Sequence, residues 1–160
     1  MKKLMIVLGF AAFLAACGNQ NNPPATDPQP AADPNTATTD NGNPSYDPKR
    51  GEGKFHDIQL PATLDAAMAD KGQKIVELKC ESCHKMTDEK LVGPGWHGVT
   101  SRHQPAWIMN FITNTDAMID KDPKAQAMLE ICMVRMPNQN LSDDDARAVL
   151  EFMRKNDGVK

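Results

Sequence analysis

The chain has 160 residues, with 18 basic and 21 acidic side chains and a formal net charge of −3 at pH 7. This length suits one modest domain, and the acidic balance argues against nucleic acid as a partner. Only four cysteines are present, so each needs an explanation.

Residues 1–16 are typical of a bacterial lipoprotein signal peptide. Two lysines at positions 2–3 precede an apolar stretch over residues 4–16, which is too short for a membrane span. Residues 14–17, Leu-Ala-Ala-Cys, resemble a lipobox, and this resemblance implies cleavage before Cys17 and lipid attachment to it. We therefore expect a protein of the cell envelope that is lipid-anchored to a membrane and faces the periplasm or exterior. An ordinary secretory signal beside an unrelated cysteine is the alternative.

Residues 17–54 are predicted to be a disordered tether. They are rich in Pro, Asn and Thr and show no apolar periodicity. Such a segment cannot bury enough apolar surface to offset its ordering entropy. About 30 residues of this kind of chain span on the order of 30–50 Å. The rest, residues 55–160, is predicted to be one domain of helices with almost no sheet.

The first predicted helix covers residues 65–79. Gly72 lies in its middle, where glycine costs about 1 kcal/mol relative to alanine. Close approach of the C-terminal helix would explain that cost. The predicted apolar face consists of Leu64, Ala67, Met68, Ile75 and Leu78.

Residues 80–84, Cys-Glu-Ser-Cys-His, are the most informative motif. The C-x-x-C-H pattern is typical of c-type haem attachment. Cys80 and Cys83 would each form a thioether with one haem vinyl group, and His84 would be the proximal iron ligand. Two alternatives stay open. One is a zinc site completed by His84, His97 or His103, although no second well-spaced ligand pair is present. The other is a thioredoxin-like dithiol, although no βαβ pattern surrounds the motif.

Three further helices are predicted after the motif. Prolines favour the first helical position, so Pro105 should start a helix that continues through Ile112, and Asp122-Pro123 another that reaches Met133. The last helix should begin after Ser142 as N-cap, with three aspartates in its first turn, and end before the glycine at position 158.

Cys132 is the cysteine left over after lipid and haem attachment. It shares a helical stripe with Ala125, Met128 and Leu129. We predict a buried, inert thiol on a core face. A reactive or intermolecular role is the alternative.

The order of these features resembles class I cytochrome c over roughly residues 67–156. The shared features are a helix, C-x-x-C-H, a loop with Gly93-Pro94, short helices, Met136-Pro137 and a terminal helix. The resemblance implies an all-α fold of short helices around one covalently bound haem c. It also implies Met136 as distal iron ligand, the Pro94 carbonyl as acceptor for His84, and Trp107 as a donor to a haem propionate.

The residues themselves also favour Met136. It lies in a polar loop directly before a proline, where core packing explains a methionine poorly, and a thioether ligand raises the haem potential. Met133, three residues earlier, is the alternative ligand. Arg102 and Arg135 are either propionate partners or solvated charges.

The remaining rings have weaker assignments. Trp96 and Trp107 either line the haem edge or pack in the core. We predict that His56, His97 and His103 are surface or loop residues and not iron ligands.

These features predict an electron carrier and not an enzyme. With His84 and Met136 both bound, the iron has no position for oxygen or peroxide. Expected partners are redox proteins near the membrane, such as a quinol-oxidising complex or a terminal oxidase or reductase. A haem-based sensor or enzyme subunit with a displaceable Met136 is the alternative, and a zinc-binding lipoprotein is the alternative without haem.

Overall fold

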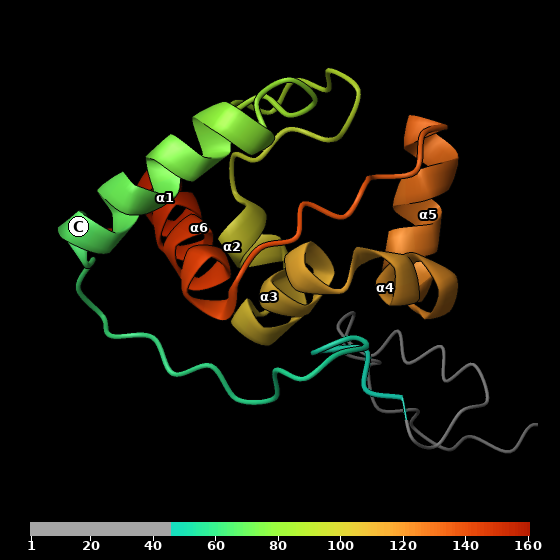
Figure 1. Cartoon of the computed structure of the whole chain (residues 1–160), viewed down its shortest axis with the longest axis horizontal. Coiled ribbons are helices and arrows are strands. Elements are labelled where there is room, and N and C mark those ends of the chain that lie inside the picture. Colours follow the sequence, from blue (N-terminus) through green and yellow to red (C-terminus); the bar gives the residue numbers. More distant parts are fainter. Residues whose placement is uncertain (1–45) are drawn as a thin grey trace, which may run out of the picture. The chain divides into compact units, whose positions relative to one another are not determined.

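The computed structural model describes residues 46–160, and this part of the chain contains helices and no strand (Figure 1). The predicted all-α fold is therefore confirmed. The signal peptide, Cys17 and the tether up to residue 45 lie outside the described residues. No helix within residues 46–160 is long and apolar enough to cross a membrane. The helices are α1 (Ala66–Lys79), α2 (Val99–Arg102), α3 (Pro105–Thr113), α4 (Thr115–Lys121), α5 (Pro123–Cys132) and α6 (Asp143–Asn156).

Helices α1 and α6 form the main helix pair. Each begins at a side-chain cap: the Asp65 carboxylate accepts from the Met68 N–H at 2.9 Å, and Ser142 Oγ accepts from the Asp145 N–H at 3.2 Å. The two helices pack against each other at Gly72.

The close approach predicted for Gly72 is confirmed. A Cβ atom at this position would lie 2.0 Å from the carbonyl oxygen of Ala148 in α6. The absence of a side chain thus lets the two backbones come together.

The apolar face predicted for α1 is wrong in part. Ala67 is exposed and Leu78 is 83% exposed, whereas Ala69, Gly72 and Val76 are buried. Small residues make this contact because α6 lies so near. A face of alanine and glycine carries little hydrophobicity, so the positions of large apolar residues do not reveal it.

Replacing Gly72 with Ala should lower the free energy of unfolding by about 1–3 kcal/mol. The new Cβ would clash with the backbone of α6, which cannot change conformation as easily as a flexible side chain. The free-energy cost of this clash is expected to exceed the ~1 kcal/mol that alanine gains in helix propensity. Urea denaturation of the haem-loaded protein measures the change. Ala67→Gly, at an exposed position of the same helix, is the control and should cost only about 1 kcal/mol. A G72A protein as stable as the wild type would show that the close contact is dispensable.

Helices α3 and α5 begin at the two predicted prolines, and α5 is capped by the Asp122 carboxylate. Helices α2 and α4 were not predicted. They span only four and seven residues, and neither has a side-chain hydrogen bond at its N-cap. Without that signal, short helices resemble loops in a sequence.

Residues 46–54 form an ordered strap, and this corrects the predicted disorder of residues 17–54 over its last part. The Asn110 amide donates to the carbonyls of Arg50 and Phe55 at 2.8 and 2.9 Å and accepts from the Phe55 N–H at 2.9 Å. The Tyr46 hydroxyl donates to the buried Asp122 carboxylate. Polar contacts thus attach the strap, at the start of the coloured chain in Figure 1, to α3 and to the N-cap of α5.

Candidate haem site

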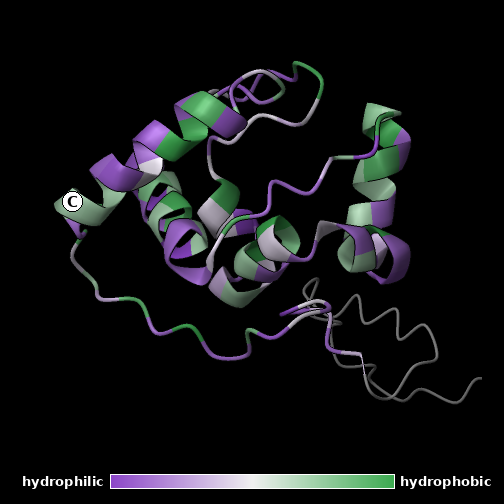
Figure 2. Ribbon diagram, in the orientation of Figure 1, coloured by the Kyte–Doolittle hydropathy of each residue, from purple (hydrophilic) through white to green (hydrophobic). Residues whose placement is uncertain are grey.

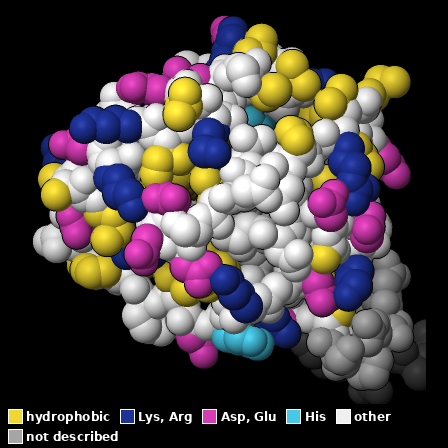
Figure 3. Space-filling model, in the orientation of Figure 1, with side chains coloured by type: hydrophobic (Ala, Val, Ile, Leu, Met, Phe, Trp, Pro, Cys, Tyr) yellow, Lys and Arg dark blue, Asp and Glu magenta, His cyan; other side chains and the backbone are white. Residues whose placement is uncertain are grey.

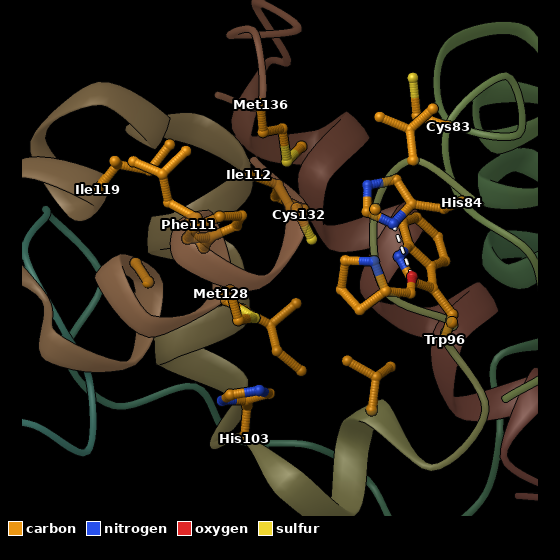
Figure 4. A pocket seen from close by; sticks show the side chains of 18 of the residues that line it. Cys83, His84, Trp96, His103, Phe111, Ile112, Ile119, Met128, Cys132 and Met136 are labelled. Atoms are coloured by element: carbon orange, nitrogen blue, oxygen red, sulfur yellow. Dashed lines mark hydrogen bonds between the residues drawn. The ribbon is translucent and has the colours of Figure 1, made fainter. Parts of the chain in front are cut away.

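The candidate site is a cavity between the loop that follows α1 and helices α3 and α5 (Figure 4). It encloses about 1020 Å³ of empty space, including the part open to solvent. Apolar side chains of α3 and α5 make up much of the wall. The residues central to the argument are Cys83, His84, Pro94, His103, Trp107, Met128, Cys132 and Met136.

His84 is held in one orientation by the loop around it. Its Nδ1 lies 2.9 Å from the Pro94 carbonyl oxygen, and because a carbonyl only accepts, Nδ1 carries the hydrogen. This leaves Nε2 free to bind a metal. Burial lowers the pKa of His84, which keeps the ring in the neutral form that ligates metals. A Cβ on Gly93 would lie 2.3 Å from Cε1 of His84, so glycine provides the room for this ring.

Met136 lies at the same cavity as His84 (Figure 4). It is half-buried, in the connection from α5 to α6 that is largely hydrophilic in Figure 2. Met133, the alternative ligand, is 87% exposed, has a left-handed backbone (φ 58°) at the C-cap of α5, and does not line the cavity. Met128 and Met153 line the wall from α5 and α6. The geometry therefore favours Met136 over Met133.

The three described cysteines differ in their surroundings. Cys83 lines the cavity, whereas Cys80 is buried in the core at the end of α1 and does not line it. Cys132 is half-buried and not fully buried as predicted, and it lines the cavity. The rest of its stripe does face the core, because Ala125 is buried there and Met128 and Leu129 pack against it, and these residues also line the cavity.

Neither alternative for the C-x-x-C pair gains support. Burial raises the pKa of the Cys80 thiol to about 11, whereas a redox dithiol needs a thiolate with a lowered pKa. Within residues 46–160 no group of three or more His, Cys, Asp or Glu side chains is placed to hold a metal ion. A zinc site thus lacks its ligands in this part of the chain.

Trp107 lines the cavity with its ring, but its indole N–H donates to Asp122 Oδ2 at 3.0 Å inside the core. Its only donor is therefore engaged, so the structure does not support Trp107 as a propionate donor. Arg135 pairs with Asp116 at 3.2 Å and Asp120 at 2.8 Å. Arg102 donates to two backbone carbonyls of the loop before α2.

His103 lies in the loop between α2 and α3, as predicted, but it is not an ordinary exposed residue. Its ring stacks on Trp107 with centroids 4.0 Å apart and an interplanar angle of 13°, and it lines the cavity. Its Nδ1 is buried and has no hydrogen-bond partner among the described residues. The other two histidines, His56 and His97, are exposed as predicted.

Exposed apolar side chains gather on the loop after α1 and around the end of α5, two segments that contribute to the cavity wall. This apolar rim consists of Leu91, Val92, Ile131, Met133 and Val134. Val92 and Val134 belong both to the rim and to the cavity wall. Figure 3 shows apolar side chains gathered along the upper right edge, where the loop after α1 and the end of α5 lie in Figure 1.

The lining fits a haem. The neutral imidazole of His84 and the thioether of Met136 can supply the two axial donors, and the walls are apolar. Cys83 of the attachment motif lines the cavity, and the buried Nδ1 of His103 lacks a hydrogen-bond partner that a polar group of the haem could supply. Fold and site together define a small all-α protein that carries one covalently bound c-type haem, which is the class I type of cytochrome c.

The chain belongs to the cytochrome c family. The family model described as Cytochrome c matches residues 69–157. Among solved structures, a cytochrome c from Rhodothermus marinus is similar to this chain with 32% identity and a TM-score of 0.63, over 66% of this chain and 90% of that one. An engineered form of that protein gives 31% identity and a TM-score of 0.63, with the same coverage of both chains. No curated protein gives a significant match.

Proposed function

We propose that this haem-based electron-transfer protein is a carrier held to a membrane by lipid on Cys17, with His84 and Met136 as the two axial ligands. When bound, the haem supplies a one-electron redox couple whose potential depends on the axial ligands and on burial. The observation that carries the proposal is that His84 and Met136 line one apolar cavity. Membership of the cytochrome c family supports electron transfer as the native role.

Each neighbouring residue has a task in this arrangement. The Pro94 carbonyl fixes the His84 tautomer and ring orientation, and Gly93 leaves space for the ring. The apolar walls lower the local dielectric and exclude water, while Met136 supplies a soft, neutral donor. With both side chains bound, no axial position is left for a substrate, so we propose no enzymatic role.

We propose that the partners are redox proteins of the respiratory chain, such as a quinol-oxidising complex or a terminal oxidase or reductase. The apolar rim supports this proposal, because two of its residues, Val92 and Val134, also line the cavity, so a partner docked on the rim would lie near the site. The signal-peptide pattern of residues 1–16 supports a location in the cell envelope, facing the periplasm or exterior.

An optical spectrum of the protein, produced in a host with haem-attachment machinery, tests the proposal. We expect a low-spin c-type spectrum with a methionine-to-iron charge-transfer band in the oxidised state. A high-spin spectrum would favour the sensor or enzyme alternative. A protein without haem absorbance would contradict the site itself.

Replacing Cys17 with Ser should move the protein from the membrane fraction to the soluble fraction. The change removes the thiol that lipid would modify, and no helix of residues 46–160 can cross a membrane. The share of the protein in the membrane and soluble fractions is measured by its haem absorbance after a salt wash. Cys132→Ser is the matched control and should remain with the membrane. A C17S protein still found wholly in the membrane fraction would contradict lipid anchoring.

A further inference from the structure

His103 has an unsatisfied polar atom in an otherwise apolar place. Its Nδ1 is buried, and no group among residues 46–160 forms a hydrogen bond with it. The ring of His103 is held by its stack on Trp107. Trp107 in turn stacks on Phe111, with ring centroids 5.1 Å apart. A buried polar atom without a partner is unfavourable, so this nitrogen points to a polar group supplied by a ligand.

The position of His103 indicates which ligand group this is. Cys83 and His103 lie at opposite ends of the cavity in Figure 4. A haem carries its two vinyl groups on one edge and its two propionates on the opposite side of the ring. Since Cys80 and Cys83 would hold the vinyl edge, the propionates would be directed toward the end where His103 lies.

The charges around His103 favour an anion there. The pKa of His103 is lowered to about 4, mainly by burial and in smaller part by the positive charges of Lys124 and Arg102, while Asp122 acts in the opposite direction. These groups come from the start of α5 and the end of α2. A carboxylate placed among them gains attraction to two cations and a hydrogen bond from the ring. Trp107 and Arg135 already bind acidic residues.

We propose that the ring of His103 binds a haem propionate and takes up a proton when the haem iron is reduced. The inference rests on the proposed carrier function. Reduction adds one electron and removes one positive charge from the iron, which makes a proton from solvent bind His103 more tightly. By linkage, protonation favours the reduced state equally, so the midpoint potential falls as pH rises through the titration of His103.

The test is the midpoint potential of the haem-loaded full chain, measured between about pH 4 and pH 9. We expect the wild-type potential to fall by up to about 59 mV per pH unit in one window, the value for one proton per electron. His103→Gln can still donate a hydrogen bond but cannot titrate, so it should lose this slope. His97→Gln, at an exposed histidine of the same region, is the control and should keep it.

A second measurement reports the hydrogen bond directly. The propionate bending band in the resonance Raman spectrum should shift in His103→Phe, which keeps the stack on Trp107 but has no donor, and should shift less in His103→Gln. A flat wild-type potential, or an unchanged slope and Raman band in both variants, would overturn the inference. Loss of the methionine charge-transfer band in His103→Gln would also overturn it, because the substitution would then act on the bond between Met136 and the iron and not only on a propionate. Failure of the carrier function itself appears separately, as a high-spin wild-type spectrum.

Discussion

A chain in which Cys80 and Cys83 are both replaced with Ala should lose covalent haem and most of its helical structure. The helices are 4 to 14 residues long, and isolated helices of this length are marginal in water. Much of the inner surface of α3 and α5 faces the cavity. Without the porphyrin that surface meets water, and the favourable burial of about 25 cal/mol per Å² is lost.

Far-UV circular dichroism and thermal melting measure this effect. The expected result is a weak helical signal without a cooperative transition. Cys132→Ala is the matched control, because Cys132 also lines the cavity but lies outside the attachment motif, and it should keep haem and fold. If the double variant melts cooperatively with wild-type helix content, the haem does not organise this core.

Met136→His should keep the haem attached and lower its reduction potential. A thioether stabilises ferrous iron, whereas an imidazole donates more strongly and stabilises ferric iron. Axial ligands tune haem potentials over as much as ~0.8 V across proteins, so we expect a fall on the order of 0.1–0.3 V. The methionine-to-iron charge-transfer band should disappear in the same variant. Redox titration followed by absorbance measures both quantities.

Two methionine variants separate ligation from packing. Met133→Leu changes an exposed residue outside the cavity, and Met128→Leu changes a wall residue, so both should keep the charge-transfer band. If Met133→Leu removes the band and Met136→His does not, the ligand lies three residues earlier in the chain. If none of the three affects it, the sixth ligand is another residue and the proposal loses its chemical basis.

The sequence predicted the elements that have local signals. Asp65 and Ser142 mark the starts of α1 and α6, and proline marks those of α3 and α5. The C-x-x-C-H motif has a fixed spacing that only a few chemistries use, so it located the haem site without tertiary information.

Features that depend on contacts between distant residues were not predictable in this way. The strap is held by Asn110, which is more than fifty residues away and pairs with backbone atoms of Arg50 and Phe55. His103 becomes part of the site only because it stacks on Trp107. The buried face of α1 depends on how closely α6 approaches Gly72. No local pattern records such contacts.

The strap also determines where mechanical load enters the domain. Tyr46 binds Asp122, and the same carboxylate accepts from the Trp107 N–H at 3.0 Å and from the Ala125 N–H at 2.8 Å. A pull along the chain from the residues before Tyr46 therefore acts first on the carboxylate that holds a cavity-wall ring and the start of α5. Tension on the lipid anchor proposed at Cys17 would thus reach the wall of the haem cavity before it reaches the α1–α6 pair.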